Sequence, residues 1–213
     1  MKEKGKISSA VIRRLPRYRR YLEDLLKKDV ERISSGELSR HIGYTASQIR
    51  QDFNNFGGFG QQGYGYNVKS LYEAIGGIMG LNREYKMTII GCGNVGQAIA
   101  NYSYYYEQGF RVVSLFDVDE TLIGSTINEI EVRDAETLGE YLAANAVDIG
   151  IICTSKSSAQ EAADKLCAGG VKGIWNFAPM DLTVPENVAL ENVHLSDSLH
   201  SLAYYINENE KES

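Results

Sequence analysis

Hydrophobic residues in the first eighty positions recur with the period of a helix. One such pattern covers about residues 11–28, where charged residues separate the apolar positions Ile12, Leu15, Leu22, Leu25 and Leu26. Pro16 falls inside this stretch, and proline is poorly tolerated in the interior of a helix. The helix therefore either starts afresh near Pro16 or is kinked there.

Two further short helices are predicted by their N-terminal capping residues. Ser34 and Glu37 have the spacing of a capping box, in which each side chain bonds the backbone amide of the other residue. Thr45 and Gln48 repeat that spacing. Because Gly43 interrupts the pattern between them, we expect two capped helices joined by a tight turn, which is a helix-turn-helix.

The second helix of this pair has one apolar and one polar face. The apolar face, expected to be buried, consists of Ala46, Ile49, Phe53 and Phe56. The polar face consists of Ser47, Arg50, Gln51 and Asn54. In the major groove Arg pairs with guanine, and Gln or Asn pairs with adenine, so this face suits base recognition. Any amphipathic helix has a polar face, but the two caps, the glycine turn and the basic flank favour DNA binding.

Glycines alternate with aromatic residues over 56–68. This composition predicts a twisted β-hairpin, which after a helix-turn-helix is a wing. The alternative is a flexible linker, although linkers favour serine and rarely carry four aromatic residues. The apolar spacing over 68–81 then predicts a helix. Residues 1–80 are therefore expected to form a winged-helix domain.

A glycine-rich motif opens the next part of the chain. An apolar strand over 87–90 runs directly into Gly91-Cys92-Gly93-Asn94-Val95-Gly96, and a helix follows. A second strand ends at Asp117, 21 residues past Gly96. This is the setting of a dinucleotide fingerprint, in which the glycines admit the diphosphate and the acidic residue accepts ribose hydroxyls. Because Asp117 would repel a 2′-phosphate, the pattern favours NAD(H). A fold of this kind that binds another nucleotide, such as coenzyme A, remains the alternative.

Strands and helices continue to alternate to the C-terminus. Strands are expected over 127–132, 147–154, 171–177 and 188–194, and helices over 135–145 and 157–168. Alternation of this kind predicts a doubly wound, mostly parallel sheet, that is, a Rossmann-like α/β domain over 81–195. Ligands bind at the carboxyl ends of such strands. Two strand ends therefore supply candidate cofactor contacts, namely Cys153 and Thr154, and Asn176, Phe177, Ala178 and Pro179. The alternative at each is an ordinary turn.

The last segment, 196–213, is predicted to be an amphipathic helix and tail. Leu195, Leu199, Leu202 and Ile206 form one apolar stripe. The stripe packs either on the sheet of its own chain or on a second subunit. Two-half-site DNA recognition favours a symmetric homodimer.

Composition and charge narrow the class of protein. Of 213 residues, 43% are hydrophobic and 23% charged, as in globular proteins. No apolar run approaches the ~18 residues of a membrane span, and the N-terminus lacks the apolar segment of a signal peptide. Three scattered cysteines and three histidines predict neither disulfides nor a metal site. We therefore expect a cytoplasmic protein with no membrane partner.

Charge is distributed unevenly along the chain. Residues 1–80 carry 14 Lys and Arg against 8 Asp and Glu, whereas residues 81–213 carry 8 against 20. A basic N-terminal part joined to an acidic C-terminal part indicates that only residues 1–80 bind a polyanion. The densest basic cluster is Arg13, Arg14, Arg17, Arg19 and Arg20, which without a recognition helix beside it would be a solvated helix face.

Catalytic residues are not evident. A dehydrogenase needs a proton donor or acceptor beside the nicotinamide. His41 lies in the helix-turn-helix, and His194 and His200 flank the last helix without a partner set. The pattern favours a sensor over an enzyme, with an NAD-dependent oxidoreductase that carries an accessory DNA-binding domain as the alternative.

Taken in order, the motifs resemble the Rex family of redox-sensing transcriptional repressors over nearly the whole chain. The motifs are Arg14-Leu15-Pro16, Tyr18, Arg20, residues 48–52, 56–60, 63–66, 91–96, 116–119 and 176–179. The resemblance implies a homodimer with a swapped C-terminal helix. It also implies binding to a palindromic operator when NAD⁺ prevails and release when NADH binds. Arg20 and Tyr102 would take part in the switch near the domain interface.

The residues and the resemblance together define three candidate sets. The cofactor set is Gly91, Cys92, Gly93, Asn94, Val95, Gly96, Tyr102, Asp117, Val118, Cys153, Thr154, Asn176, Phe177, Ala178 and Pro179. The DNA set is Arg14, Arg17, Ser47, Gln48, Arg50, Gln51, Asn54, Phe59, Gly60, Gln62, Gly63 and Tyr64. The switch and dimer set is Arg20, Tyr102, His194, Leu195, Leu199, Leu202 and Ile206. No catalytic or metal-binding residue is predicted.

The sequence departs from the family pattern in three features. Gln51 follows the recognition arginine where the family has a basic residue, and Gln61 and Gln62 stand where the family's wing is basic. His194 stands where the family commonly has an aspartate that pairs with the switch arginine, here Arg20. These departures are expected to weaken phosphate contacts and to alter the interface switch.

Overall fold

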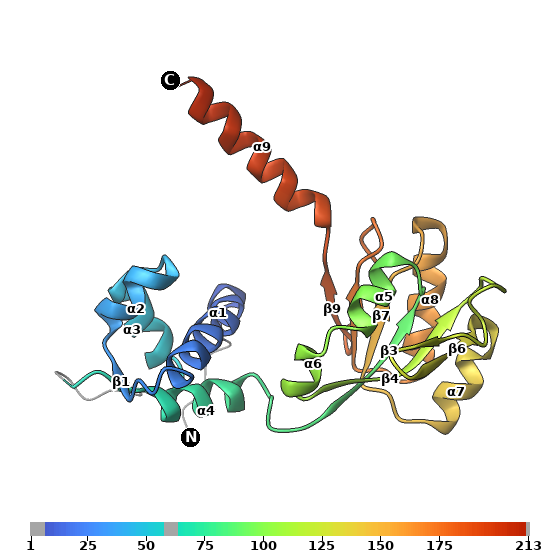
Figure 1. Cartoon of the computed structure of the whole chain (residues 1–213), viewed down its shortest axis with the longest axis horizontal. Coiled ribbons are helices and arrows are strands. Elements are labelled where there is room, and N and C mark those ends of the chain that lie inside the picture. Colours follow the sequence, from blue (N-terminus) through green and yellow to red (C-terminus); the bar gives the residue numbers. More distant parts are fainter. Residues whose placement is uncertain (1–6, 58–63, 212–213) are drawn as a thin grey trace. The chain divides into compact units, whose positions relative to one another are not determined.

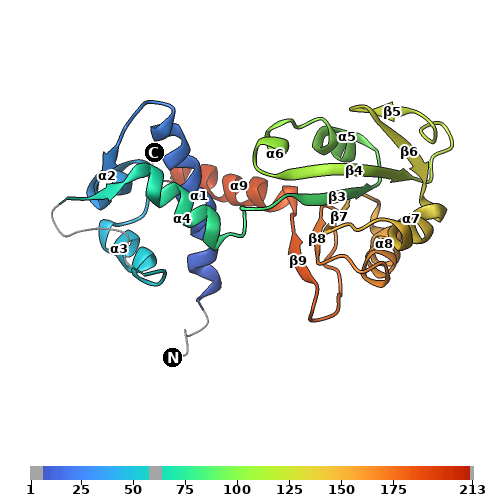
Figure 2. The same cartoon turned by 90° about the horizontal axis from the view of Figure 1, so that it is seen from below.

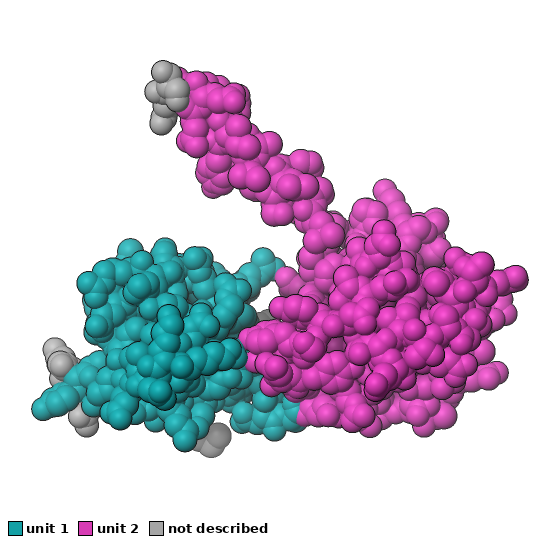
Figure 3. All heavy atoms as spheres, in the orientation of Figure 1, with its two compact units in different colours: residues 1–83 teal, residues 84–213 magenta. Residues whose placement is uncertain are grey.

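The computed structural model describes residues 7–57 and 64–211. The chain divides into two compact units, Met1–Arg83 and Glu84–Ser213, which Figure 3 shows in teal and magenta. The first unit holds the predicted helix-turn-helix and the second holds the predicted Rossmann sheet.

Unit 1 is a small helical domain with a two-stranded sheet (Figure 1). Its elements are α1 (Ser9–Leu26), β1 (Arg32–Ile33), α2 (Ser35–Ile42), α3 (Ala46–Asn54), β2 (Tyr66–Asn67) and α4 (Val68–Ile78). One hydrophobic cluster joins all four helices and is built on Leu15, Tyr18, Leu22, Leu38, Ile49, Phe53, Leu71 and Ile75.

The first helix runs through Pro16 rather than starting there. Ser8 caps it, and its hydroxyl accepts from the amide of Val11, so Pro16 lies well inside the helix. Of the apolar positions at helical spacing, Leu15, Leu22 and Leu25 are buried, whereas Ile12 is 45% exposed. Val11 and Tyr18 complete the inward face.

The predicted capping box forms at α2, whereas at α3 the structure shows the cap by Thr45 without the reciprocal bond from Gln48. Ser34 and Glu37 form a reciprocal capping box, and Gly43 ends α2 in the left-handed conformation at φ +71°. Thr45 caps α3 by accepting from the amide of Gln48 at 3.2 Å. These contacts establish the tight turn that orients α3.

The predicted wing is only partly described. Residues 58–63, which include Phe59, Gly60, Gln61, Gln62 and Gly63, lie outside the described residues. The strand at the end of the segment, β2, pairs antiparallel with β1, which comes from the region before α2. The sequence did not predict this pairing.

Unit 2 is built on a seven-stranded sheet in the order β5-β6-β4-β3-β7-β8-β9. The strands are β3 (Tyr85–Ile90), β4 (Phe110–Asp117), β5 (Thr126–Ile127), β6 (Ile130–Asp134), β7 (Ile149–Ile152), β8 (Gly173–Asn176) and β9 (Ala189–Asn192). Six strands are parallel, and only the edge strand β5 pairs antiparallel. The parallel strands follow the third-second-first-fourth-fifth-sixth order of a Rossmann sheet, as predicted.

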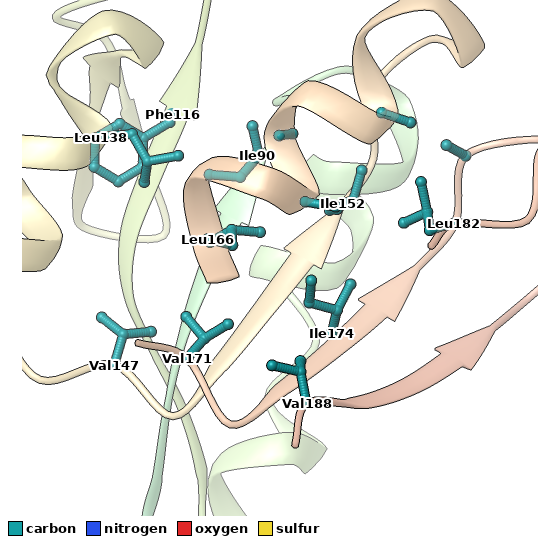
Figure 4. Close-up of a cluster of buried hydrophobic side chains, with 14 of the residues drawn as sticks. Ile90, Phe116, Leu138, Val147, Ile152, Leu166, Val171, Ile174, Leu182 and Val188 are labelled. Atoms are coloured by element: carbon teal, nitrogen blue, oxygen red, sulfur yellow. The ribbon is translucent and has the colours of Figure 1, made fainter. Parts of the chain in front are cut away.

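Helices cover both faces of this sheet (Figure 2). On one face lie α5 (Asn94–Ala100) and α6 (Tyr104–Glu107), and on the other lie α7 (Leu138–Ala144) and α8 (Lys156–Ala168), with a 3-10 turn, η1 (Ala135–Thr137), before α7. Successive strand residues alternate between two cores. Figure 4 shows one of them, in which Ile90, Phe116 and Ile152 meet α7 and α8 through Leu138 and Leu166.

One local prediction in unit 2 is wrong. The strand expected over 127–132 is a hairpin of β5 and β6, because Asn128 and Glu129 adopt positive φ values of 49° and 65° and reverse the chain. The tyrosine-rich segment does not continue the first Rossmann helix. That helix ends at Ala100, and Tyr104 begins the separate helix α6.

The C-terminal helix α9 (Leu195–Lys211) has no buried residue. Figure 1 draws it apart from the sheet of its own unit. Of the two alternatives for its apolar stripe, packing on its own sheet is therefore excluded in this structure. None of the helices in the described part of the chain has the length and apolar composition of a membrane span.

Candidate nucleotide and nucleic-acid sites

The candidate nucleotide site lies at the carboxyl end of the first parallel strand. β3 has β4 on one side and β7 on the other, so the strand order reverses here. In doubly wound sheets this switch point is where nucleotides bind. The chain leaves β3 at Gly91 and enters α5 with Gly93 as its N-cap. The glycine-rich motif thus joins the central strand to a helix N-terminus, as its sequence predicts.

The three motif glycines differ in what a side chain would meet. At Gly91, φ is +94° and an added Cβ would lie 2.7 Å from the carbonyl oxygen of Cys153. At Gly96, an added Cβ would collide with the carbonyl oxygen of Gly91. At Gly93, nothing lies within 4 Å. Two glycines are therefore required for packing of the chain itself, and Gly93 leaves space on the open side of the loop.

Asp117 is held in place at the end of β4. Its carboxylate accepts from the amide of Cys92 and from the amides of Val118 and Asp119, at 2.7 and 2.9 Å for the latter two. A carboxylate has about four lone-pair positions, so one at Oδ2 stays available for a ribose hydroxyl. Val118, next in the chain, is 79% exposed and offers an apolar surface beside it.

A pocket of about 230 Å³ joins these groups. Six of its ten lining residues belong to the predicted cofactor set. The lining consists of Ile90, Gly91, Gly93, Asp117, Val118, Ala135, Cys153, Thr154, Ser155 and Ser158. This volume is below the roughly 300–1,000 Å³ of a pocket that encloses a small ligand, so it suits only part of a dinucleotide. Two larger grooves of unit 2, of about 520 and 440 Å³, contain none of the motif glycines.

Four residues of this lining were not predicted from the sequence, namely Ile90, Ala135, Ser155 and Ser158. Ser155 is the N-cap of α8, so a second helix N-terminus borders the pocket. Its position directly after the strand end at Cys153 and Thr154 was the signal that could have identified it. Burial raises the pKa of both Cys92 and Cys153 to about 12, so both thiols are neutral. Cys153 lines the pocket, whereas Cys92, although predicted to contact the cofactor, is fully buried.

Asn176 has a structural role that its sequence did not reveal. It is fully buried, and its Nδ2 donates to the Met180 carbonyl at 2.7 Å and to Asn192 Oδ1 at 2.9 Å. Its Oδ1 accepts from the amide of Ala178 at 2.9 Å. The side chain is thus used to fold the 176–180 turn, and of the predicted 176–179 group Pro179 is exposed whereas Ala178 is buried.

Tyr102 and Phe177, both predicted cofactor residues, lie at the two ends of one row of aromatic rings. Tyr102 is 51% exposed and contacts Tyr105 at 4.8 Å between ring centroids. Tyr105 then meets Trp175 at 5.8 Å, and Trp175 meets Phe177 at 4.6 Å. The structure therefore links the loop after α5 to the carboxyl end of β8, although neither residue lines the pocket described above.

The recognition face of α3 is exposed as predicted. Ser47, Arg50, Gln51 and Asn54 are all exposed, and Gln48 is partly so. Arg50 donates from Nη1 to Ser35 Oγ at 3.0 Å, a bond that does not use the Nε and Nη2 donors of its guanidinium. Tyr64 is 70% exposed, with the guanidinium of Arg32 5.8 Å from its ring centroid.

Two arginines of the basic cluster have different surroundings. Arg17 is exposed, with its guanidinium 5.3 Å from the ring centroid of Tyr44. Arg14 instead turns inward and binds Asp52 of α3 through Nε at 2.6 Å and Nη2 at 2.7 Å. The structure therefore gives Arg14 a partner within unit 1, whereas the sequence had suggested a phosphate.

The switch and dimer residues are accessible in the structure. His194 Nε2 lies 3.1 Å from Asp181 Oδ1, so this histidine has an acidic partner within its own unit. Arg20 is exposed. The stripe residues of α9 expose between 51% and 65% of their surface and are Leu195, Leu199, Leu202 and Ile206. The described residues contain no cluster of His, Cys, Asp or Glu able to hold a metal ion.

A recognition helix in one unit and an open dinucleotide cradle in the other define a class of protein, the ligand-responsive transcription regulators. Two family models match the chain. The model described as "Putative DNA-binding protein N-terminus" matches residues 6–54, and the "CoA binding domain" model matches residues 82–180.

Curated relatives and solved structures identify the family. Redox-sensing transcriptional repressor Rex of Thermoanaerobacter pseudethanolicus is 58% identical over 99% of this chain and 94% of its own length. Rex of Clostridium tetani is 58% identical over 99% and 100%. The crystal structure of RSP with β-NAD⁺ and operator DNA has a TM-score of 0.91 at 58% identity, over 96% of this chain and 94% of that one. RSP with β-NADH has a TM-score of 0.89 at 55% identity, over 96% of each chain. The chain belongs to the Rex family of redox-sensing transcriptional repressors.

Proposed function

We propose that this chain binds palindromic operator DNA as a homodimer and leaves it when NADH binds, so that transcription follows the NADH/NAD⁺ ratio. The observation that carries the proposal is the open space at Gly93 beside the fixed carboxylate of Asp117, in one chain with the exposed polar face of α3. The RSP structures contain NAD⁺ with operator DNA and, separately, NADH. The named relatives are repressors rather than enzymes.

Each part of the chain has its own role in this proposal. Residues 1–80 bind DNA, residues 81–195 bind NAD(H), and residues 196–213 form the dimer contact and tail. Such a repressor acts in the cytoplasm, where it meets both the chromosome and the nicotinamide pool. The signal is chemical, because the oxidised ring carries a charge that the reduced ring lacks. Apolar surroundings disfavour an unpaired charge, and a tenfold preference for NADH requires only about 1.4 kcal/mol.

A DNA-binding titration tests the proposal against its alternatives. The full-length protein is titrated with a palindromic duplex in the presence of NAD⁺, NADH, NADPH or coenzyme A in turn. Release by NADH alone supports the redox repressor. Release by coenzyme A would support a regulator that responds to coenzyme A, the nucleotide in the description of the matching family model. Turnover of NADH with a carbonyl substrate would support an oxidoreductase.

Asp117→Ala is expected to weaken NADH binding and to narrow the preference for NADH over NADPH. The substitution removes the carboxylate. That group offers a free position at Oδ2 to a ribose hydroxyl and repels a 2′-phosphate. The loss of one hydrogen bond to a charged acceptor corresponds to about 1.5–3 kcal/mol. Fluorescence titration of both nucleotides measures the change. Unaltered discrimination against NADPH would contradict the assignment of Asp117 as the ribose acceptor.

Arg50→Ala and Arg17→Ala are expected to weaken DNA binding in different ways. Arg50 lies on the recognition face, so its loss should cost about 1–3 kcal/mol at one base pair and relax specificity there. Arg17 is exposed on α1, so its loss should weaken all duplexes alike and reduce the salt dependence. Affinities for operator variants at several salt concentrations distinguish the two. A uniform loss for Arg50→Ala would assign Arg50 to a phosphate.

A further inference from the structure

Asp52 stands out as a buried carboxylate in the middle of the recognition helix. It is 2% exposed, and in the described part of the chain it is the one charged residue among the buried polar side chains. Its neighbours in sequence, Gln51 and Phe53, point to opposite sides, Gln51 to solvent and Phe53 to the core. A buried charge is costly unless it is fully paired, so its partners indicate why it is there.

Both partners of Asp52 come from α1. Arg14 binds it with two parallel bonds, Nε to Oδ2 at 2.6 Å and Nη2 to Oδ1 at 2.7 Å. Tyr18 donates its hydroxyl to Oδ2 at 2.6 Å. The fork geometry of a bidentate arginine fixes direction as well as distance. The carboxylate is therefore held from three donors, all on one neighbouring helix.

The two donor residues, Arg14 and Tyr18, keep their protons throughout the physiological pH range. The hydrogen bond to Asp52 raises the pKa of Arg14, and burial together with Asp52 raises the pKa of Tyr18. Tyr18 is also wedged edge-on between Tyr44, at 5.7 Å, and Phe53, at 5.1 Å. The buried group of Asp52, Arg14 and Tyr18 thus connects α1 with α3 and with the turn before it.

We propose that Asp52, Arg14 and Tyr18 form a positioning clamp that sets the depth and rotation of α3 for base recognition. This inference rests on the proposed operator binding. Arg50, Gln51 and Asn54 lie within two residues of Asp52 on a helix of only nine residues, so any rotation of α3 moves all of them. Apolar contacts through Ile49 and Phe53 tolerate such rotation better than a bidentate ion pair does. The clamp therefore determines sequence discrimination rather than general affinity for DNA.

This role divides the arginine cluster by function. The guanidinium of Arg14 binds Asp52, so Arg14 is a positioning residue. Arg17, one turn further along α1, is exposed and serves the phosphate backbone. Sequence alone placed both in the same basic patch, and the inward direction of Arg14 separates them.

Arg14→Lys tests the clamp because it keeps the positive charge but cannot form the fork. The full-length variant is titrated with the operator and with an unrelated duplex of equal length at several salt concentrations, and its melting temperature is recorded. Operator affinity is expected to fall by roughly tenfold, the discrimination carried by about one bidentate base contact. Affinity for the unrelated duplex and the salt dependence should stay unchanged. Tyr18→Phe, which removes one donor and keeps the ring, should lower the ratio of the two affinities by less.

Arg17→Ala is the matched control, since it should lower both affinities and flatten the salt dependence. If Arg14→Lys and Tyr18→Phe lowered the melting temperature but left the affinity ratio intact, the network would be structural only and the proposal overturned. Equal losses on both duplexes with a flatter salt dependence would make Arg14 a phosphate contact, which also overturns it. A wild-type protein that fails to discriminate the operator would instead refute the proposed function, and the clamp with it.

Discussion

Gly93→Ala is expected to weaken NADH binding strongly without lowering the stability of the protein. A Cβ at this position meets nothing within 4 Å, and the backbone angles of −70° and −166° are open to alanine. Loss of a glycine restricts the unfolded chain, so stability should rise by about 0.4–1 kcal/mol. The second glycine of a dinucleotide motif, however, is where the backbone approaches the diphosphate. A methyl group there should reduce affinity by about a hundredfold or more, or roughly 2.8 kcal/mol.

Gly96→Ala provides the matched comparison. Its methyl group would collide with the carbonyl oxygen of Gly91, and Ile89 Cγ2 would lie 3.4 Å away. Here the protein's own helix and strand are forced apart, so stability should fall by about 1–3 kcal/mol. Calorimetric titration with NADH and thermal unfolding of both variants separate the two effects. If Gly93→Ala bound NADH normally, or unfolded as early as Gly96→Ala, the diphosphate would not lie over Gly93.

The Rossmann part of the fold could be predicted because each of its signals is local. The apolar runs that end in Gly91 and Asp117 are short strands, and their alternation with helices implies a parallel order. The hairpin of β5 and β6 was missed for a local reason too. Residues 127–132 look like one continuous strand, and only the positive φ of Asn128 and Glu129 divides it.

Pairings distant in sequence could not be predicted in the same way. β1 and β2 have two residues each, too few to show a period, and their paired residues are 33 and 35 positions apart in the sequence. Arg14 and Asp52 are 38 positions apart, and nothing in the spacing of an arginine cluster says which member turns inward. Sequence gives the position of a side chain along its helix, whereas its direction depends on what packs opposite.

The candidate site divides along the same line. Gly91, Gly93 and Asp117 meet in one pocket because they follow or end the neighbouring parallel strands β3 and β4, whose carboxyl ends lie at the same edge of the sheet. Asn176 was predicted as a ligand contact from its place at a strand end, but its side chain bonds Ala178 and Met180 of the following turn and Asn192 of β9. A polar residue at a strand end has the same appearance in sequence whether it faces a ligand or its own loop. Only the partner atoms distinguish the two roles.

Truncation after His194 is expected to abolish the dimer and, with it, binding to a two-half-site operator. The stripe of α9 exposes more than half of each of its four apolar side chains, and a helix in this state needs a partner surface. The Rossmann core should fold without it, because β9 ends at Asn192 and no residue of α9 is buried. One winged helix alone reaches only one half-site. Sedimentation of the truncated chain, with its NADH affinity as a measure of folding, gives the result.

Two single substitutions make the same test without removing the helix. Leu199→Glu places a charge in the stripe, whereas His200→Glu places it on the adjacent, off-stripe position of the same exposed helix. Leu199→Glu should weaken the free energy of dimerisation by about 2–4 kcal/mol, the range for an interface hot spot. His200→Glu should leave it unchanged. Because the monomer retains the pocket around Gly93 and Asp117, NADH binding should survive in all three proteins. A truncated chain that stayed dimeric and still bound the palindrome would place the subunit contact on the sheet unit itself and leave the stripe of α9 without that role.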